Sequence, residues 1–151
     1  MQILSLRGGF VETTHDVRAV AIAHGADHTE RVVYESGPSL RSTWRSAGKP
    51  VQLWASLQAM DDPIFPPEDL AIGASSHSGQ DGHLARVRAL LDRFGAQESE
   101  LLCGAEAPAH RQTREALIRD AEAALDLHND CSGKHAFMLG ACHHQGWSLA
   151  Y

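Results

Sequence analysis

Residues 45–52 read RSAGKPVQ, and this stretch contains one of the two lysines in the 151-residue chain. Ser46 and Lys49 are three residues apart, so on a helix or tight turn a hydroxyl and an amine face the same way. Pro50 suits the first turn of a helix, where amides are unpaired anyway, and it disfavours helical geometry at Lys49. The stretch therefore predicts the start of a helix, with Ser46 and Lys49 at its N-terminus.

A serine and a lysine placed in this way form a candidate nucleophile. A lysine that is desolvated by an apolar wall can lose its proton near neutral pH and take the proton of an attacking serine, whereas arginine cannot. The helix amides and the positive end of the helix dipole favour a developing oxyanion. The S-x-x-K spacing also arises by chance, and the alternative is a capping serine beside a solvated lysine.

Apolar spacing predicts a series of helices after this stretch. One continues from residue 53 to residue 60 and ends at the proline-broken loop DDPIFPPED. Another covers residues 84–94, with Gly95 as its stop. Two more are predicted from Thr113 to about Leu125 and from Gly133 to Gly146, and DLAIGA is a short apolar run between the first two.

The N-terminal region has the composition of strands. FVETTH, VRAVAIA and RVVYES are rich in Val, Ile, Tyr and Thr, and the turn formers Gly25 and Asp27 lie between the last two. Strands followed by helices, without a βα repeat, predict an α+β fold. Three strands leave an edge of the sheet unpaired, so we expect an incomplete chain whose further strands come from a second half or a partner chain.

Composition excludes several classes of function. The formal net charge is −6, and no basic run of the kind that follows a phosphate backbone is present. The apolar runs are too short for a secretory signal or a membrane span, which predicts a cytoplasmic location. Three scattered cysteines, Cys103, Cys131 and Cys142, suit a reducing compartment as free thiols or metal ligands.

The loop ASSHSGQDGH, residues 74–83, is a second polar candidate. Ser76 or Ser78 is suited to a proton relay, and His77 to a base or a hydrogen-bond donor for the substrate. The alternative is a serine-rich loop that caps the following helix.

The densest polar cluster is HNDCSGKH, residues 128–135. Cys131 and His135 share a helix face and make a plausible half of a zinc site, but a second ligand pair at proper spacing is absent from the sequence. Lys134 can instead lower the pKa of the Cys131 thiol or, when deprotonated, ligate a metal. A helix start with a buried cysteine is the structural alternative.

Taken in order, RGGFVETTH, RSAGKPVQ, ASSHSGQDGH, LLCG and HNDCSGKHAFML resemble the motifs of the L-asparaginase II family, the rhizobial-type or thermolabile asparaginases. The resemblance runs from Arg7 to about Gly146 and implies that residues 1–151 form the N-terminal half of a single domain. It implies a fold like that of serine β-lactamases and penicillin-binding transpeptidases, in which S-x-x-K opens a central helix.

The resemblance also implies a reaction, the hydrolysis of L-asparagine to L-aspartate and ammonia. Ser46 and Lys49 match one Ser-Lys pair, and Ser76 matches the serine of a second pair whose lysine is expected beyond the chain. Cys131 and Lys134 match the zinc ligands of the family, with a further cysteine also expected beyond residue 151. The resemblance also implies that the protein forms a homodimer.

Several assignments rest on neighbourhood or remain open. Charge and position suggest that Arg45 and His77 hold substrate carboxylates. Asp130 stands where asparagine is usual in the family, and its negative charge beside the metal position affects the expected affinity for zinc. The alternatives are a Ser-Lys hydrolase of another amide (glutamine, a β-lactam or a peptide), a truncated non-catalytic half, and a metal-binding module built on Cys131, Lys134 and His135.

Overall fold

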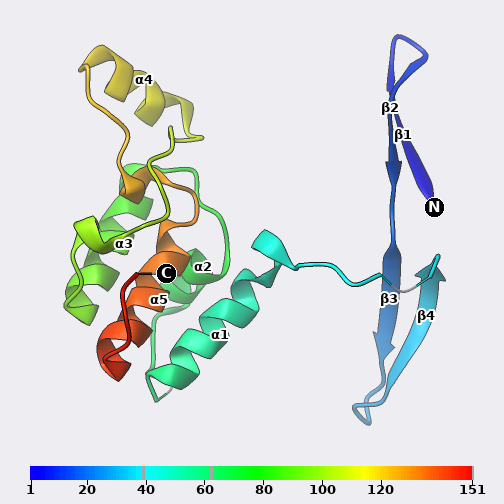
Figure 1. Ribbon diagram of the computed structural model, residues 1–151, viewed down its shortest axis with the longest axis horizontal. Helices are drawn as coiled ribbons and strands as arrows, with labels where there is room; N and C mark the ends of the chain where they lie inside the picture. Colours follow the sequence, from blue (N-terminus) through cyan, green and yellow to red (C-terminus); the bar gives the residue numbers. More distant parts are fainter. Residues whose placement is uncertain (39, 62, 151) are drawn as a thin grey trace. The chain divides into compact units, whose positions relative to one another are not determined.

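The structure, a computed structural model, describes residues 1–38, 40–61 and 63–150. The chain divides into two compact units, Met1–Thr43 and Trp44–Tyr151. Strands make up the first unit and helices the second (Figure 1). This order confirms the α+β class predicted from the sequence.

In the part of the first unit that the structure describes, the strands form two antiparallel hairpins. Strand β1 (Gln2–Arg7) pairs with β2 (Phe10–Asp16), and β3 (Ala19–His24) pairs with β4 (Glu30–Ser36). Two glycines connect β1 to β2 with φ values of 57° and 84°, a left-handed backbone that glycine adopts without strain. The tight turn follows from these two residues.

Three of the four strands agree with the sequence prediction, and β1 is an additional one. The strands form two two-stranded sheets rather than the single three-stranded sheet that was expected. The predicted turn between β3 and β4 is confirmed, because the Asp27 carboxylate accepts hydrogen bonds from the amide and hydroxyl of Thr29. Large apolar side chains on the strands are exposed, including Leu6 (61%) and Phe10 (81%), and among the described residues the buried apolar side chains belong to the second unit.

The described residues of the second unit form five α-helices and three short 3₁₀ turns. Helices α1, α3 and α5 correspond to predicted helices, and Gly95 ends α3 with a φ of 69° as expected. The helices are α1 (Lys49–Ala59), α2 (Pro67–Ala74), α3 (Asp81–Phe94), α4 (Arg111–Arg119) and α5 (Ser132–Gln145), and the turns are η1 (Arg45–Gly48), η2 (Glu98–Glu100) and η3 (Asp126–His128).

Three local details differ from the sequence predictions. The short apolar run DLAIGA lies in helix α2, which begins at prolines and is held by packing. Helix α4 ends at Arg119 instead of near Leu125, because it buries no residue and Ala121 leaves the helix with a φ of 54°. Lys49 adopts helical angles, φ −52° and ψ −44°, since the 3₁₀ turn η1 leads directly into α1 and overrides the preference imposed by Pro50.

The core of the second unit lies around helix α5. This helix packs against α1, α2 and α3, and Figure 1 shows it among them. The fully buried ring of Phe137 contacts Phe65 and Phe94, with ring centroids 5.0 and 5.6 Å apart. A Cβ added to Gly73 would lie 2.6 Å from the Phe137 ring, so the absence of a side chain lets α2 approach α5. This close approach positions the loop that follows α2.

Candidate active site

Lys49 and Ser76 are joined by a short hydrogen bond. Lys49 is the first residue of α1 and is only 2% exposed, although it carries a charged type of side chain. Its Nζ donates to the Oγ of Ser76 at 2.6 Å, across 27 residues of sequence. Because a buried amine needs a polar partner, this contact compensates part of the desolvation of Lys49.

Ser46 lies in the 3₁₀ turn η1, and its side chain is exposed. The amide of Lys49 donates to the Ser46 carbonyl, so the two residues are joined through the backbone. Among the residues that the structure describes, the hydrogen bond of the Lys49 side chain goes to Ser76, and none joins it to the Ser46 hydroxyl. The role of Ser46 as nucleophile stays a prediction.

Only some of the backbone amides at the N-terminus of α1 are free to donate a hydrogen bond to an oxyanion. The amide of Ala47 donates to the carbonyl of Trp44 at 3.1 Å, and that of Lys49 is bonded to Ser46. The sequence prediction assumed exposed amides, and the 3₁₀ turn changes this because it pairs the amides of the first helical turn.

The close contact of α2 with the start of α5 determines where Ser76 lies. A Cβ on Gly133 would be 2.4 Å from the backbone oxygen of Ile72, so only glycine allows this approach. The amide of His77 then donates to the carbonyl of Asp130 at 3.0 Å. The Ser76 loop is thereby attached to the turn that precedes α5.

Asp130 and Cys131 extend the polar cluster around Lys49 and Ser76. The hydrogen-bonding Cys131 thiol and then the Ser76 hydroxyl lower the pKa of Asp130, and the charge of Lys49 acts in the same direction. Burial and the hydrogen bond with Asp130 raise the pKa of Cys131, whereas Lys49 lowers it. The four side chains therefore interact, and Asp130 supplies a negative charge to the cluster.

His77 is buried beside this cluster, with 7% of its surface exposed. Its Nδ1 accepts a hydrogen bond from the amide of Gly79, and its Nε2 lies 2.8 Å from the Oγ of Ser132. Burial and then the charge of His83 lower the pKa of His77. Both ring nitrogens of His77 have protein partners. The role of His77 as a substrate ligand stays a prediction.

The predicted zinc ligands Cys131 and Lys134 both lie at the start of α5. Burial and the nearby charges of Asp126 and Cys131 raise the pKa of Cys103 to about 11, while Lys134 lowers it, so Cys103 shares this region. Within the described ranges, no group of three or more His, Cys, Asp or Glu side chains is placed to hold a metal ion. These residues supply an incomplete donor set rather than the four ligands of a structural zinc site.

Two further predicted residues lie near the cluster in sequence. Arg45 is exposed and has a φ of 48°, a left-handed value that is uncommon outside glycine and is often found at functional sites. His135 is partly buried, and burial followed by the charge of Lys134 lowers its pKa to about 4. Its amide donates to the carbonyl of Cys131 at 3.2 Å.

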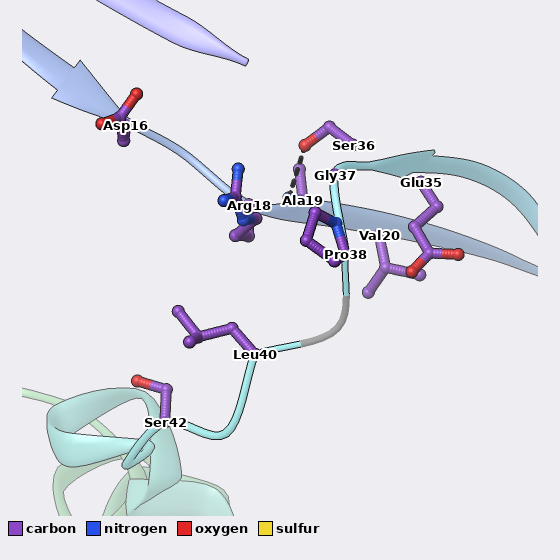
Figure 2. Close-up of a pocket in the computed structure, with 10 residues that line it drawn as sticks. All are labelled: Asp16, Arg18, Ala19, Val20, Glu35, Ser36, Gly37, Pro38, Leu40 and Ser42. Atoms are coloured by element: carbon purple, nitrogen blue, oxygen red, sulfur yellow. Dashed lines mark hydrogen bonds between the residues drawn. The ribbon is translucent and has the colours of Figure 1, made fainter.

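The described residues line cavities in both units. A cavity of about 260 Å³ adjoins the candidate site and is lined by Ser76, His77, His83, Arg86 and Glu68, among others. A cavity of about 540 Å³ lies in the first unit, next to the hairpin of β3 and β4 (Figure 2). The amide of Ala19 donates to the Oγ of Ser36 there, and none of the predicted site residues lines it.

The fold and the site define an α+β protein in which a buried lysine contacts a serine on an exposed loop. A comparison with protein-family models matches residues 3–151 to L-asparaginase II, and the chain belongs to this family. A comparison with curated proteins finds no match. Among the described segments, none of the helices has the length and apolar character required to span a bilayer.

The sequence indicates most members of the cluster but not the contact between Lys49 and Ser76. The expected pairing of Ser76 with a further lysine stays a prediction. Ser132 was not singled out at all. Its position directly after Cys131, at the start of a predicted helix, was a signal only for a capping residue.

Proposed function

We propose that this protein is an amidohydrolase that converts L-asparagine to L-aspartate and ammonia with a Ser-Lys apparatus. The single observation that carries the proposal is the 2.6 Å hydrogen bond between Lys49 Nζ and Ser76 Oγ. Family membership supports the reaction class and a small-molecule substrate. We also propose the serine β-lactamase-like fold that the family resemblance implies, completed by further strands beside the exposed hairpins.

The first half of the reaction forms an acyl-enzyme. Ser46 Oγ attacks the side-chain amide carbon of asparagine, and the uncharged amine of Lys49 accepts the hydroxyl proton. The tetrahedral intermediate then collapses and the carbon–nitrogen bond breaks. The leaving nitrogen takes a proton from the Lys49 ammonium through the hydroxyl of Ser76, so ammonia departs and an ester remains.

The second half of the reaction hydrolyses this ester. Water attacks the ester carbon, gives up a proton to the same lysine–serine relay, and releases L-aspartate as the Ser46 oxygen regains its proton. The contact between Lys49 and Ser76 supports the relay, because proton transfer requires heavy atoms within hydrogen-bond reach.

Arg45 is proposed to bind a carboxylate of the substrate. Its guanidinium has the fork of donors that suits a carboxylate, and it directly precedes the proposed nucleophile. Another amide, such as glutamine or a β-lactam, fits the same apparatus, and a substrate profile separates these possibilities. If the chain is instead non-catalytic, it should release ammonia from none of these amide substrates.

We propose that Cys131 and Lys134 are ligands of a zinc ion, with the remaining donors supplied from outside the described residues. A zinc ion held there would act as a Lewis acid close to the cluster of Lys49 and Ser76. Metal analysis of the purified protein should find bound zinc, and the Cys131→Ser variant should lose it. A metal-free wild-type protein would remove this part of the proposal.

We also propose that the protein is a homodimer and that it is located in the cytoplasm.

The decisive experiment measures ammonia release from L-asparagine by the intact protein. We expect Ser46→Ala, Lys49→Ala and Ser76→Ala each to lower kcat by roughly 10³-fold or more. Ser99→Ala, on an exposed 3₁₀ turn, is the matched control and should keep wild-type activity. Full activity in both Ser46→Ala and Lys49→Ala would end the proposal.

Mass spectrometry of the trapped acyl-enzyme then identifies the nucleophile. An aspartyl adduct on the peptide that contains Ser46 supports the order of steps given above. An adduct on Ser76 would exchange the roles of the two serines and leave the reaction class unchanged.

A further inference from the structure

His77 takes part in a chain of hydrogen bonds in which the position of each proton is determined. The amide of Gly79 donates to His77 Nδ1 at 3.1 Å, so this nitrogen carries a lone pair. The hydroxyl of Ser132 donates to the carbonyl of Leu127 at 3.0 Å, so its oxygen is free to accept. The 2.8 Å contact between His77 and Ser132 is therefore an Nε2–H donating to Oγ.

This chain of hydrogen bonds is buried at both ends. Ser132 is fully buried and His77 is 7% exposed. A buried polar network of this kind holds a single arrangement, because each unpaired group would cost the desolvation free energy of a lost hydrogen bond. His77 is thus fixed as a neutral ring with a defined tautomer.

The ring and the backbone of His77 are both anchored to the segment before α5. Its amide donates to the carbonyl of Asp130 at 3.0 Å, and its ring reaches Ser132 two residues further on. Ser76 directly precedes His77 and contacts Lys49. The anchoring of His77 therefore restricts the position of the Ser76 hydroxyl.

We propose that His77 is a positioning residue whose Nε2–H bond to Ser132 holds Ser76 against Lys49. The inference rests on the proposed amidohydrolase function for its consequence in catalysis, while the anchoring itself is a property of the fold. A shift of about 1 Å in a reacting group lowers a rate by about 10²-fold, so loss of the anchor acts on kcat. Substrate affinity is expected to change little if both ring nitrogens of His77 keep their protein partners during the reaction, and the KM measured below separates this positioning role from the substrate contact that the sequence suggested.

The test removes the acceptor and the donor of the bond separately. Ser132→Ala and His77→Leu should each lower kcat for ammonia release by about 10²-fold, per folded molecule, with KM changed by less than about twofold. The double variant should be no slower than either single variant, since one interaction is lost in all three. His77→Gln, whose amide can still donate to Ser132, should stay within about tenfold of the wild type.

His144→Gln is the matched control, because His144 bonds to Asp61 on the surface and should leave kcat unchanged. Circular dichroism at the assay temperature corrects each rate for the folded fraction. Unchanged kcat in Ser132→Ala, or a KM effect that accounts for the whole loss, would overturn the proposal.

Two measurements remain decisive even when the wild type releases no ammonia and the proposed function fails. Nitrogen-15 NMR of the intact protein should show His77 as the neutral Nε2–H tautomer, and an imidazolium or an Nδ1–H tautomer overturns the inference. A crystal structure of Ser132→Ala should show Ser76 Oγ beyond hydrogen-bond distance from Lys49 Nζ. An unchanged contact in that structure overturns it equally.

Discussion

Lys49 and Ser76 are 27 residues apart in sequence, yet the Nζ of one donates a 2.6 Å hydrogen bond to the Oγ of the other. Lys49 begins helix α1, and Ser76 lies in the loop between α2 and α3. Lys49 is 2% exposed whereas Ser76 is an exposed residue, so the bond joins a buried amine to a hydroxyl at the surface.

Lys49→Arg should abolish activity although arginine is also a basic side chain. Arginine does not release its proton in proteins, so it cannot accept the proton of a serine. We expect kcat to fall about 10³-fold, which corresponds to about 4 kcal/mol in the activation free energy. Arg111→Lys, at a site where the side chain is 81% exposed, is the control for an Arg–Lys exchange. An active Lys49→Arg enzyme would show that Lys49 is not the base.

Gly133→Ala should destabilise the second unit and reduce activity together. The added Cβ would lie 2.4 Å from the Ile72 backbone oxygen, which cannot move without shifting the end of α2. Overpacking of this kind costs about 3 kcal/mol in the free energy of unfolding, measured by chemical denaturation.

Gly82→Ala is the matched control for this substitution. Nothing lies within 4 Å of a Cβ added to Gly82, which is in the first turn of α3. Alanine should raise the stability there by about 0.5–1 kcal/mol through helix propensity. Equal effects of the two substitutions would contradict the close approach of α2 and α5.

Asp130→Asn should make the Cys131 thiol more acidic and more reactive. The hydrogen bond and the charge of Asp130 raise the pKa of Cys131, adding to the effect of burial, and asparagine removes the charge. In a background with Cys103 and Cys142 changed to serine, we expect faster alkylation by iodoacetamide at pH 8. Asp92→Asn, on an exposed part of α3, should leave the rate unchanged. A slower reaction of Asp130→Asn would reverse the assigned electrostatic effect.

The free energy of unfolding should fall as the pH decreases from about 6.5 to about 4. The folded-state pKa of His135 is lowered to about 4 by burial, so the unfolded chain binds a proton that the folded chain rejects. The stabilisation is complete above pH 6.5 and is lost below it, by at most about 3 kcal/mol from this residue. The lowered pKa of His77 acts in the same direction.

Chemical denaturation between pH 8 and pH 4 measures this dependence. His135→Gln should flatten the curve between pH 6.5 and pH 4, because it removes the group that titrates there. A wild-type free energy of unfolding that stays constant from pH 7 to pH 5 would show that His135 is not desolvated in the folded protein.

Local signals were sufficient for most elements of the fold. The apolar spacing of α1, α3 and α5 predicted these helices, because one face of each packs into the core. The short apolar run in α2 shows no such periodicity, and periodicity alone cannot distinguish a short buried helix from a buried strand. Helix α4 was predicted too long because helix propensity does not show that a segment lacks a packing partner.

The amino-acid sequence by itself determined the family, the α+β order and the identity of the polar residues, through ordered motifs that need no knowledge of packing. It did not indicate that Lys49 meets Ser76, or that Ser132 anchors His77. Sequence spacing reports which residues share the face of one element, whereas contacts between elements depend on how closely helices approach. Only the tertiary structure decided these pairs, because the missing side chains of Gly73 and Gly133 let α2 pack directly on α5.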